Sequence, residues 1–428
     1  MLIEFSVSNF RSFRDRQTLS MVAAPRLRRK ENTFKPDLDG EDFPGLLKVA
    51  AVYGPNASGK SNLVSALRAV SAIAGLVPQP TPIPLPVEPF RFDRLLADSP
   101  SRFEVHFVCR RQRYHMTLAV RKDRIEEEIL LCFPKGRETL LYERRHAHGR
   151  DEYEFGSDLE GGKNVHDTWS KLTGPDRLFL SQAVANSSAE LQQLRIPLTW
   201  LTTGLLTIPG ITNPGLTLRS FASFTQNFVK SRPDLTKGLT AFIRDLDIPV
   251  THVRFDSAPP ETRKIKNATD QSSEDARRVL DVNEVRAIFT HRTAMGEASF
   301  DFDDESTGTQ NLVGFYLPWV LLHQAEHSGW RALIIDELDT SLHPNIVSEL
   351  IRRHLNSDTR SQLIFTTHDT HLMDTRLLRR DQMWLTERDV NGATQLRSIH
   401  DFEGRESEDV EKRYYEGRYR GLPIVRTE

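Results

Sequence analysis

The chain contains the segment Gly54-Pro55-Asn56-Ala57-Ser58-Gly59-Lys60-Ser61. It fits the pattern Gly-x-x-x-x-Gly-Lys-Ser/Thr, in which the glycines let backbone N–H groups curl around a phosphate. An apolar run, Leu47–Tyr53, comes before the loop, and Ser61–Ala74 follows it with apolar residues at helical spacing. A strand, a glycine loop and a helix in this order are what phosphate binding requires, so we predict a nucleotide-binding α/β fold.

The loop also predicts ligands. Lys60 is expected to reach the β and γ phosphates of ATP, and Ser61 is expected to ligate Mg²⁺. The residues predicted to contact the nucleotide here are Gly54, Pro55, Asn56, Ala57, Ser58, Gly59, Lys60, Ser61 and Asn62. The alternative for this stretch is a glycine turn that carries an exposed lysine.

A second carboxylate is needed for a magnesium-bound nucleotide, and Arg331-Ala-Leu-Ile-Ile-Asp336-Glu337 supplies one. Its four apolar residues predict a central strand, since buried parallel strands are apolar throughout. Asp336 is predicted to hold the metal at the carboxyl end of that strand, and Glu337 to polarise the attacking water. A solvated strand end is the alternative.

Composition limits the class of protein. The 428 residues are 38% hydrophobic, with 57 Lys+Arg against 59 Asp+Glu, and this length predicts two or three domains, or one large domain with an insertion. The two cysteines indicate a reducing cytoplasm. The longest apolar run, Leu312–Leu322, is too short for a membrane helix, so no membrane span is expected. A net charge of −2 lacks the global basic signature of many nucleic-acid binders. Local basic clusters at 26–30, 263–266 and 376–380 leave contact with DNA open.

The remaining pattern changes along the chain. Short alternating segments between Phe103 and Phe155 predict an antiparallel meander, after a proline-rich surface linker at Pro78–Pro89. Four helices are predicted after Gly162, at 176–185, 189–206, 218–230 and 235–245. Residues 257–284 are polar and charged. Strands at 331–336, 361–367 and 382–386, with a helix at 344–355, then predict a parallel α/β sheet.

Several motifs together resemble a family. Asp336-Glu337-Leu-Asp339-Thr-Ser-Leu-His343-Pro344 looks like the Walker B motif and D-loop of ABC-type ATPases in the SMC, RecF and OLD group. Ser361–His368 resembles the next strand with its switch histidine, and Asp304–Gln310 resembles the signature motif. Val7–Phe13 is similar to the opening strand and turn of SMC and RecF heads. The motifs occur in the family's order.

This resemblance implies further site residues. His368 would sense the γ-phosphate, Arg11 would contact the nucleotide, and Ser306 and Gly308 would meet the nucleotide held by a second copy of the head. The active site would then be completed only in a homodimer or higher homo-oligomer. Glu305-Ser-Thr-Gly-Thr replaces the commoner Leu-Ser-Gly-Gly-Gln. A helix cap is the alternative for Ser306, and a packed histidine at a strand end is the alternative for His368.

The resemblance also implies a domain plan. An ABC-type ATPase head would be formed by residues 1–160, with the phosphate loop and β meander, and by residues 284–428, with the signature, Walker B motif, D-loop and switch histidine. Residues 161–283 would be a helical insertion. The fold class is thus an α/β P-loop NTPase with an antiparallel β subdomain and an inserted helical lobe.

We expect the part of the chain after His368 to be too short for the Toprim nuclease domain that OLD-type proteins carry. The whole chain resembles stand-alone ATPase components of bacterial phage-defence systems, of the RloA and AriA kind. That likeness implies an ATP-hydrolysing sensor or regulator with a separate effector, such as a Toprim-type nuclease. A RecF-like repair ATPase that binds DNA directly is the first alternative, and a small-molecule kinase that uses the phosphate loop alone is the second.

Overall fold

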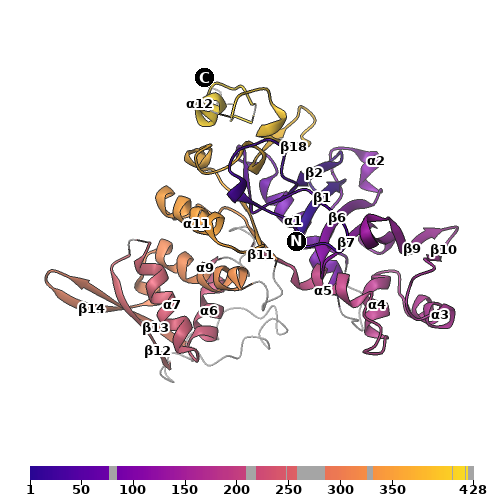
Figure 1. The fold of residues 1–428 in the computed structure, drawn as a ribbon, viewed down its shortest axis with the longest axis horizontal. Helices are drawn as coiled ribbons and strands as arrows, with labels where there is room; N and C mark the ends of the chain where they lie inside the picture. The colour runs from indigo at the N-terminus through magenta and orange to yellow at the C-terminus, as the bar shows by residue number, and fades with distance from the viewer. Residues whose placement is uncertain are drawn as a thin grey trace. The chain divides into compact units, whose positions relative to one another are not determined.

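Figure 1 shows the fold as a computed structural model that describes residues 1–76, 84–208, 218–246, 248–257, 285–324, 331–406, 408–419 and 421–422. The chain divides into two compact units. Unit 1 comprises Met1–Pro209, Leu322–Asp339 and Leu350–Glu428, and unit 2 comprises Gly210–Leu321 and Thr340–Glu349. The domain plan that the resemblance implies, with boundaries at 160 and 283, stays a prediction.

Unit 1 contains a six-stranded sheet in the order β11-β15-β16-β5-β17-β18. All neighbouring pairs are parallel except β17 and β18. Its strands are β11 (Leu205–Ile208), β15 (Ala332–Ile335), β16 (Gln362–Thr366), β5 (Val49–Tyr53), β17 (Met383–Arg388) and β18 (Thr394–Ser398). The central strands β5, β15 and β16 are buried along their whole length, because helices or loops cover both faces of a parallel sheet. The strands predicted at 47–53, 331–336, 361–367 and 382–386 are confirmed.

One predicted helix is wrong at its end. Residues 189–206 were expected to be helical, but α5 covers only Arg195–Thr203 and is followed by β11. Gly204 marks the change, since a Cβ there would lie 2.5 Å from the carbonyl oxygen of Trp200. The next residues pair with β15 in parallel register, Leu205 opposite Ala332. The open sheet edge therefore determines the structure of a segment whose local pattern suits a helix.

The second sheet of unit 1 is antiparallel, in the order β10-β9-β8-β7-β6-β1-β2. Its strands are β1 (Leu2–Ser8), β2 (Gln17–Ser20), β6 (Ser101–Cys109), β7 (Gln112–Val120), β8 (Ile125–Cys132), β9 (Thr139–Ala147) and β10 (Arg150–Phe155). A two-stranded pair, β3 (Thr33–Phe34) and β4 (Leu46–Leu47), and a short helix α2 (Arg94–Ala97) complete this part. The predicted meander is confirmed, and the amino-terminal strand extends it.

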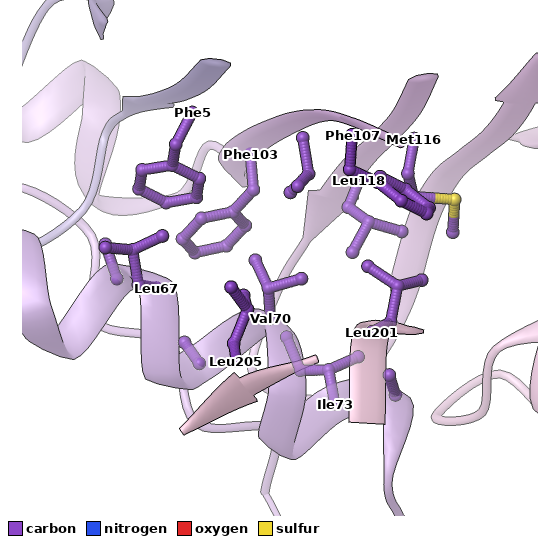
Figure 2. Close-up of a cluster of buried hydrophobic side chains, with 14 of the residues drawn as sticks. Phe5, Leu67, Val70, Ile73, Phe103, Phe107, Met116, Leu118, Leu201 and Leu205 are labelled. Carbon is purple, nitrogen blue, oxygen red and sulfur yellow. The ribbon is translucent and has the colours of Figure 1, made fainter. Parts of the chain in front are cut away.

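The core of unit 1 joins both sheets through helix α1 (Lys60–Ala74). Figure 2 shows aromatic side chains of the antiparallel sheet facing apolar side chains of α1, α5 and β11. The labelled residues of this cluster are Phe5, Leu67, Val70, Ile73, Phe103, Phe107, Met116, Leu118, Leu201 and Leu205. Each fully buried side chain of this kind contributes about 1.5 to 3 kcal/mol. The helix that follows the glycine loop is therefore fixed along its length.

Helices α3 (Lys163–Leu172) and α4 (Phe179–Ala185) belong to unit 1. A buried carboxylate attaches α4 to the meander: Glu128 accepts hydrogen bonds from the backbone N–H groups of Phe179 (2.7 Å) and Leu180 (3.0 Å). The Tyr142 hydroxyl donates to the same carboxylate at 2.7 Å, and the buried Arg144 lies 3.8 Å away. These contacts explain why α4 groups with the sheets.

The proline-rich stretch differs from the prediction. Residues 77–83 lie outside the described part, but Leu85 and Val87 are buried in the core. The N–H of Leu85 donates to the carbonyl oxygen of Lys122 at 2.8 Å. The prediction of a surface linker is therefore wrong for this part, because proline spacing does not reveal which apolar residues between the prolines are buried.

Unit 2 contains α6 (Leu218–Val229), α7 (Pro233–Arg244), most of α9 (Thr307–His323) and the start of α11 (Pro344–Asn356). Its antiparallel sheet consists of β12 (Val250–Ser257), β13 (Val285–Thr293) and β14 (Gly296–Asp301). The predicted helices at 218–230 and 235–245 are confirmed, and the predicted polar segment at 257–284 lies almost wholly outside the described residues. Within the part that the structure describes, no helix is long and apolar enough to cross a membrane.

Candidate nucleotide site

Three predicted segments meet at one edge of the parallel sheet. The glycine loop follows β5, Asp336 follows β15, and His368 lies just after β16. Since β16 pairs with both β5 and β15 in parallel, all three segments lie at carboxyl ends of neighbouring strands. Ligands of open α/β sheets bind at such an edge.

Left-handed backbone torsions shape the glycine loop. The φ angles are +151° at Gly54, +60° at Ala57 and +111° at Gly59. A Cβ at Gly59 would lie 2.1 Å from Oγ1 of Thr394, and one at Gly54 would lie 2.4 Å from Oγ1 of Thr386. Glycine is therefore required at both ends of the loop, by torsion and by space.

Hydroxyl groups from distant parts of unit 1 form hydrogen bonds with the loop and with the start of α1. The Ser58 and Thr386 hydroxyls lie 2.6 Å apart, and the Thr394 hydroxyl lies 2.8 Å from the carbonyl oxygen of Ser58. Ser12 also takes part, since the Asn62 side-chain amide donates to its hydroxyl at 2.7 Å. Ser12, Thr386 and Thr394 were not predicted as parts of the site, because no local pattern marks a hydroxyl that contacts a loop far away in the chain.

Lys60 is buried at the start of α1. Its ammonium donates to the carbonyl oxygens of Gly54 (2.8 Å) and Pro55 (3.1 Å). Burial lowers the pKa of Lys60 to about 8, while the negative charges of Asp336 and Glu337 act in the opposite direction. The predicted lysine and the predicted carboxylates thus lie close enough to interact electrostatically.

Asp336 and Glu337 form the turn after β15. Asp336 is buried, and its Oδ1 accepts a hydrogen bond from the Thr366 hydroxyl at 2.6 Å. The backbone N–H of Glu337 donates to Oγ1 of Thr366 at 2.7 Å. Glu337 has a φ of +56°, a left-handed conformation that costs about 1 to 3 kcal/mol for a residue with a side chain. Strain of this kind is concentrated at functional sites.

His368 lies beside these carboxylates. Its backbone N–H donates to Oδ2 of Asp339 at 3.2 Å. Burial lowers the pKa of His368, the charge of Lys60 lowers it further, and the carboxylates of Asp339, Glu337 and Asp336 partly offset this. The pKa shift favours the uncharged imidazole, and His368 interacts electrostatically with Lys60 and with the carboxylates of Asp336 and Glu337.

A cavity of about 910 Å³ opens next to the loop in unit 1. Four described segments line it: the start of the glycine loop, the residues just after β16, the end of β17 and the chain around α12 (Val410–Tyr415). The lining residues from these segments include Gly54, Pro55, Asn56, Ser58, Thr367, His368, Thr370, Tyr414, Tyr415 and Gly417. The Thr370 hydroxyl donates to Oε1 of Glu411 at 2.8 Å, which ties the carboxyl-terminal segment to the site.

Arg11 also lies in unit 1, and it contacts helix α1. Its guanidinium donates to the Ser65 hydroxyl at 3.1 Å and to Oε1 of Glu88 at 3.3 Å. Ser65 is one turn along α1 from Ser61, so Arg11 contacts the helix that begins at the loop. A contact between Arg11 and nucleotide stays a prediction.

Ser306 and Gly308 belong to unit 2, at the start of α9. The exposed Ser306 hydroxyl accepts a hydrogen bond from the N–H of Thr309 at 3.2 Å, which is the geometry of a helix cap. A Cβ at Gly308 would lie 2.6 Å from the carbonyl oxygen of Ser341, so glycine lets the helix start approach that loop. Their predicted contact with nucleotide in a second copy stays a prediction.

The donor atoms of Ser61 and Asp336 are of the kind that magnesium prefers, and their role as ligands stays a prediction. Ser61 in the first turn of α1 offers a hydroxyl oxygen, and Asp336 offers a carboxylate with one oxygen already hydrogen-bonded by Thr366. Mg²⁺ prefers oxygen ligands of this type, usually one or two from the protein, together with phosphate oxygens and water. Within the described ranges, no cluster of three or more His, Cys, Asp or Glu side chains is arranged to hold a metal.

Solved structures with a similar arrangement include three SMC heads. One is titled "Crystal structure of the SmcHead bound to the C-winged helix domain of ScpA" (12% identity, 93% of this chain and 97% of that chain covered, TM-score 0.41). Another is an SMC head domain from Thermotoga maritima (14%, 93% and 98%, TM-score 0.39). A third is an Smc head domain with an extended coiled coil bound to the C-terminal domain of ScpA, derived from Pyrococcus furiosus (10%, 94% and 97%, TM-score 0.40).

Sequence comparison gives a family. No curated protein matches the chain. Residues 49–374 match the AAA_21 family, described as "AAA domain, putative AbiEii toxin, Type IV TA system". The match begins at β5, includes the glycine loop, Asp336 and His368, and spans well over half of the chain. The chain therefore belongs to this AAA-domain family of P-loop ATPases.

Proposed function

We propose that the chain binds Mg·ATP at the loop Gly54–Ser61 and hydrolyses it at the edge of the parallel sheet. The observation that carries this proposal is the convergence of one buried lysine with the carboxylates of Asp336 and Glu337 and the imidazole of His368. A glycine turn with an exposed lysine does not account for it, because Lys60 is buried and its ammonium points back into the loop.

Each residue then has a chemical role. Lys60 exchanges its hydrogen bonds to the carbonyl oxygens of Gly54 and Pro55 for the β and γ phosphate oxygens, a stronger charge-assisted contact. Ser61 and Asp336 hold Mg²⁺, which neutralises phosphate charge when it is bound. Glu337 accepts a proton from the attacking water, and His368 contacts the γ-phosphate.

We also propose that a second copy completes the site. Ser306 is exposed at the amino-terminal end of α9, a helix of 17 residues. A hydroxyl and the positive end of a helix dipole at an exposed position suit a phosphate. The Ser306 oxygen accepts the N–H of Thr309 and also lies 3.0 Å from the Thr309 hydroxyl. When Thr309 is the donor in that pair, Ser306 can donate its proton to a phosphate.

For the biological role, we propose a sensor or regulator in antiphage defence that acts with a separate effector. The family description names a toxin and a type IV toxin–antitoxin system, which supports a role in defence. The RecF-like alternative requires a basic DNA surface. Arg379 and Arg380 of one candidate cluster are buried and bonded within the protein, which gives that alternative less support.

Substitution of Lys60 by alanine tests the biochemical proposal. ATP binding followed by calorimetry should be lost, because one lysine supplies the charge at the β and γ phosphates. The matched control is Lys237→Ala on α7, an exposed lysine whose loss should leave ATP binding unchanged. Near-normal phosphate release by purified Lys60→Ala protein would contradict the proposal.

The defence role has its own test. Phage should form fewer plaques on cells that carry the gene with its neighbours than on cells that carry the same genes with the Lys60→Ala substitution. Equal plaque numbers across a broad phage panel would contradict the defence role and leave the ATPase proposal standing.

A further inference from the structure

Thr366 is the last residue of β16, and it lies beside the end of β15. Its side chain is buried, at 1% exposure, and it touches both residues that the proposed function assigns to metal binding and water activation. We infer that Thr366 is a positioning residue that orients Asp336 for the metal and Glu337 for water. The inference rests on the proposed function and adds a residue to it.

The geometry of the hydroxyl group is specific. It donates its one proton to Oδ1 of Asp336 at 2.6 Å, and its oxygen accepts the backbone N–H of Glu337 at 2.7 Å. The Thr366 carbonyl oxygen also accepts the N–H of Leu338 at 3.1 Å. One residue of β16 thus holds three consecutive residues of the turn.

Each hydrogen bond has a consequence for the site. The bond to Asp336 occupies one carboxylate oxygen and fixes the rotation of the carboxylate, so the second oxygen has a defined direction toward a metal. The bond from Glu337 holds its backbone in the left-handed conformation, with a φ of +56°. Partners that orient metal ligands in this way typically change metal affinity or activity 10- to 100-fold when they are removed.

Substitution of Thr366 by valine and by serine distinguishes the effect of the hydroxyl group from the effect of side-chain shape. Thr366→Val keeps the volume and the backbone bond to Leu338 but removes both hydroxyl contacts. Thr366→Ser keeps the hydroxyl and loses one methyl group. A positioning role predicts that serine restores what valine loses, whereas a packing role predicts no such rescue.

The test uses Mn²⁺ and the non-hydrolysable analogue adenylyl imidodiphosphate, with binding followed by calorimetry. In the Thr366→Val protein we expect about 10- to 100-fold weaker Mn²⁺ binding to the nucleotide complex. Binding of the analogue in EDTA should be unchanged, because Lys60 and the loop are intact. In the Thr366→Ser protein, Mn²⁺ binding should be within about threefold of wild type, less than half of one 1.4 kcal/mol step.

Thr18→Val is the matched control, since Thr18 is a strand residue of β2 whose hydroxyl lies 2.8 Å from that of Ser6 and lines no part of the site. Its Mn²⁺ affinity should stay at the wild-type value. If Thr366→Val does not fold, as judged by its melting temperature, Thr366→Ala is measured in its place.

The outcomes separate two failures. Unchanged Mn²⁺ affinity in the valine or alanine protein would overturn the role of Thr366 and leave the ATPase proposal intact. An equal loss of Mn²⁺ affinity in the Thr366→Ser and Thr366→Val proteins would also overturn the positioning role of Thr366. A wild-type protein that binds the analogue identically with and without Mn²⁺ would refute the metal-dependent ATPase itself and Thr366 with it.

Discussion

A methyl group added at Gly59 should disable the phosphate loop. A Cβ there would lie 2.1 Å from Oγ1 and 2.8 Å from Cγ2 of Thr394, and 3.0 Å from Oγ of Ser12. Overpacking of this kind costs about 1 to 3 kcal/mol. The φ of +111° adds about 1 to 3 kcal/mol for a residue with a side chain. The sum for Gly59→Ala is about 2 to 6 kcal/mol.

This free energy can be released by moving the loop, and ATP binding then has to restore the native loop. Since 1.4 kcal/mol is tenfold in affinity, ATP should bind at least about 30-fold more weakly, as measured by calorimetry. The control is Gly149→Ala in the β9–β10 turn. Its φ is +77° and a Cβ there would meet nothing within 4 Å, so only the torsional cost applies, far from the loop in the chain. ATP affinity of the control should equal that of wild type.

A second substitution distinguishes the steric clash with Thr394 from the cost of the left-handed φ at residue 59. Thr394→Ala removes the two closest atoms, so Gly59→Ala combined with Thr394→Ala should recover about 1 to 3 kcal/mol of the loss. Thr394→Ala alone should weaken ATP binding modestly, because it removes the contact to the carbonyl oxygen of Ser58. Wild-type affinity in Gly59→Ala would refute the loop geometry, and a double variant no better than Gly59→Ala would refute the role of Thr394.

Two further predictions concern stability. Burial lowers the pKa of His354 to about 3, so the unfolded chain takes up a proton below about pH 6.5 while the folded chain does not, and stability falls as the pH drops from 6.5 toward 3. Between pH 7 and pH 5, the free energy of unfolding measured in urea should therefore fall by about 2 kcal/mol less in His354→Gln than in wild type. An equal fall in both proteins would contradict the burial of a neutral imidazole. Phe107→Ala should lower the free energy of unfolding by about 3 to 5 kcal/mol, because the ring is fully buried and stacks on Trp200 with 4.0 Å between centroids. A loss below 1 kcal/mol would show that this contact between β6 and α5 is not formed.

Local signals account for the parts of the fold that could be predicted. The loop Gly54–Ser61 has a fixed spacing and lies between a buried strand and an amphipathic helix, so β5 and α1 followed directly. The strand before Asp336 could be predicted because a buried parallel strand is apolar throughout. Both patterns depend on neighbours in the chain, which a single sequence displays.

Other features depend on contacts between distant residues. The segment Leu205–Ile208 has no strand pattern of its own and becomes β11 only because β15 offers an open edge. The hydroxyls of Thr366, Thr386 and Thr394 reach the site from β16, β17 and β18, and threonine is common in strands for reasons unrelated to function. The sequence therefore predicted the residues expected to touch the nucleotide and missed those that hold them in place.

The most direct test of the central claim is the size of the Glu337→Gln protein with and without Mg·ATP, measured by light scattering. Glutamine keeps the size of the side chain and removes the charge that activates water, so ATP should stay bound while hydrolysis falls about 10²- to 10⁴-fold. The mass should double on addition of Mg·ATP, and Ser306→Arg in the same chain should reverse this, since arginine would block the contact with the second nucleotide. Normal hydrolysis by Glu337→Gln, or one unchanged monomer mass in every nucleotide state, would contradict a nucleotide-assembled ATPase.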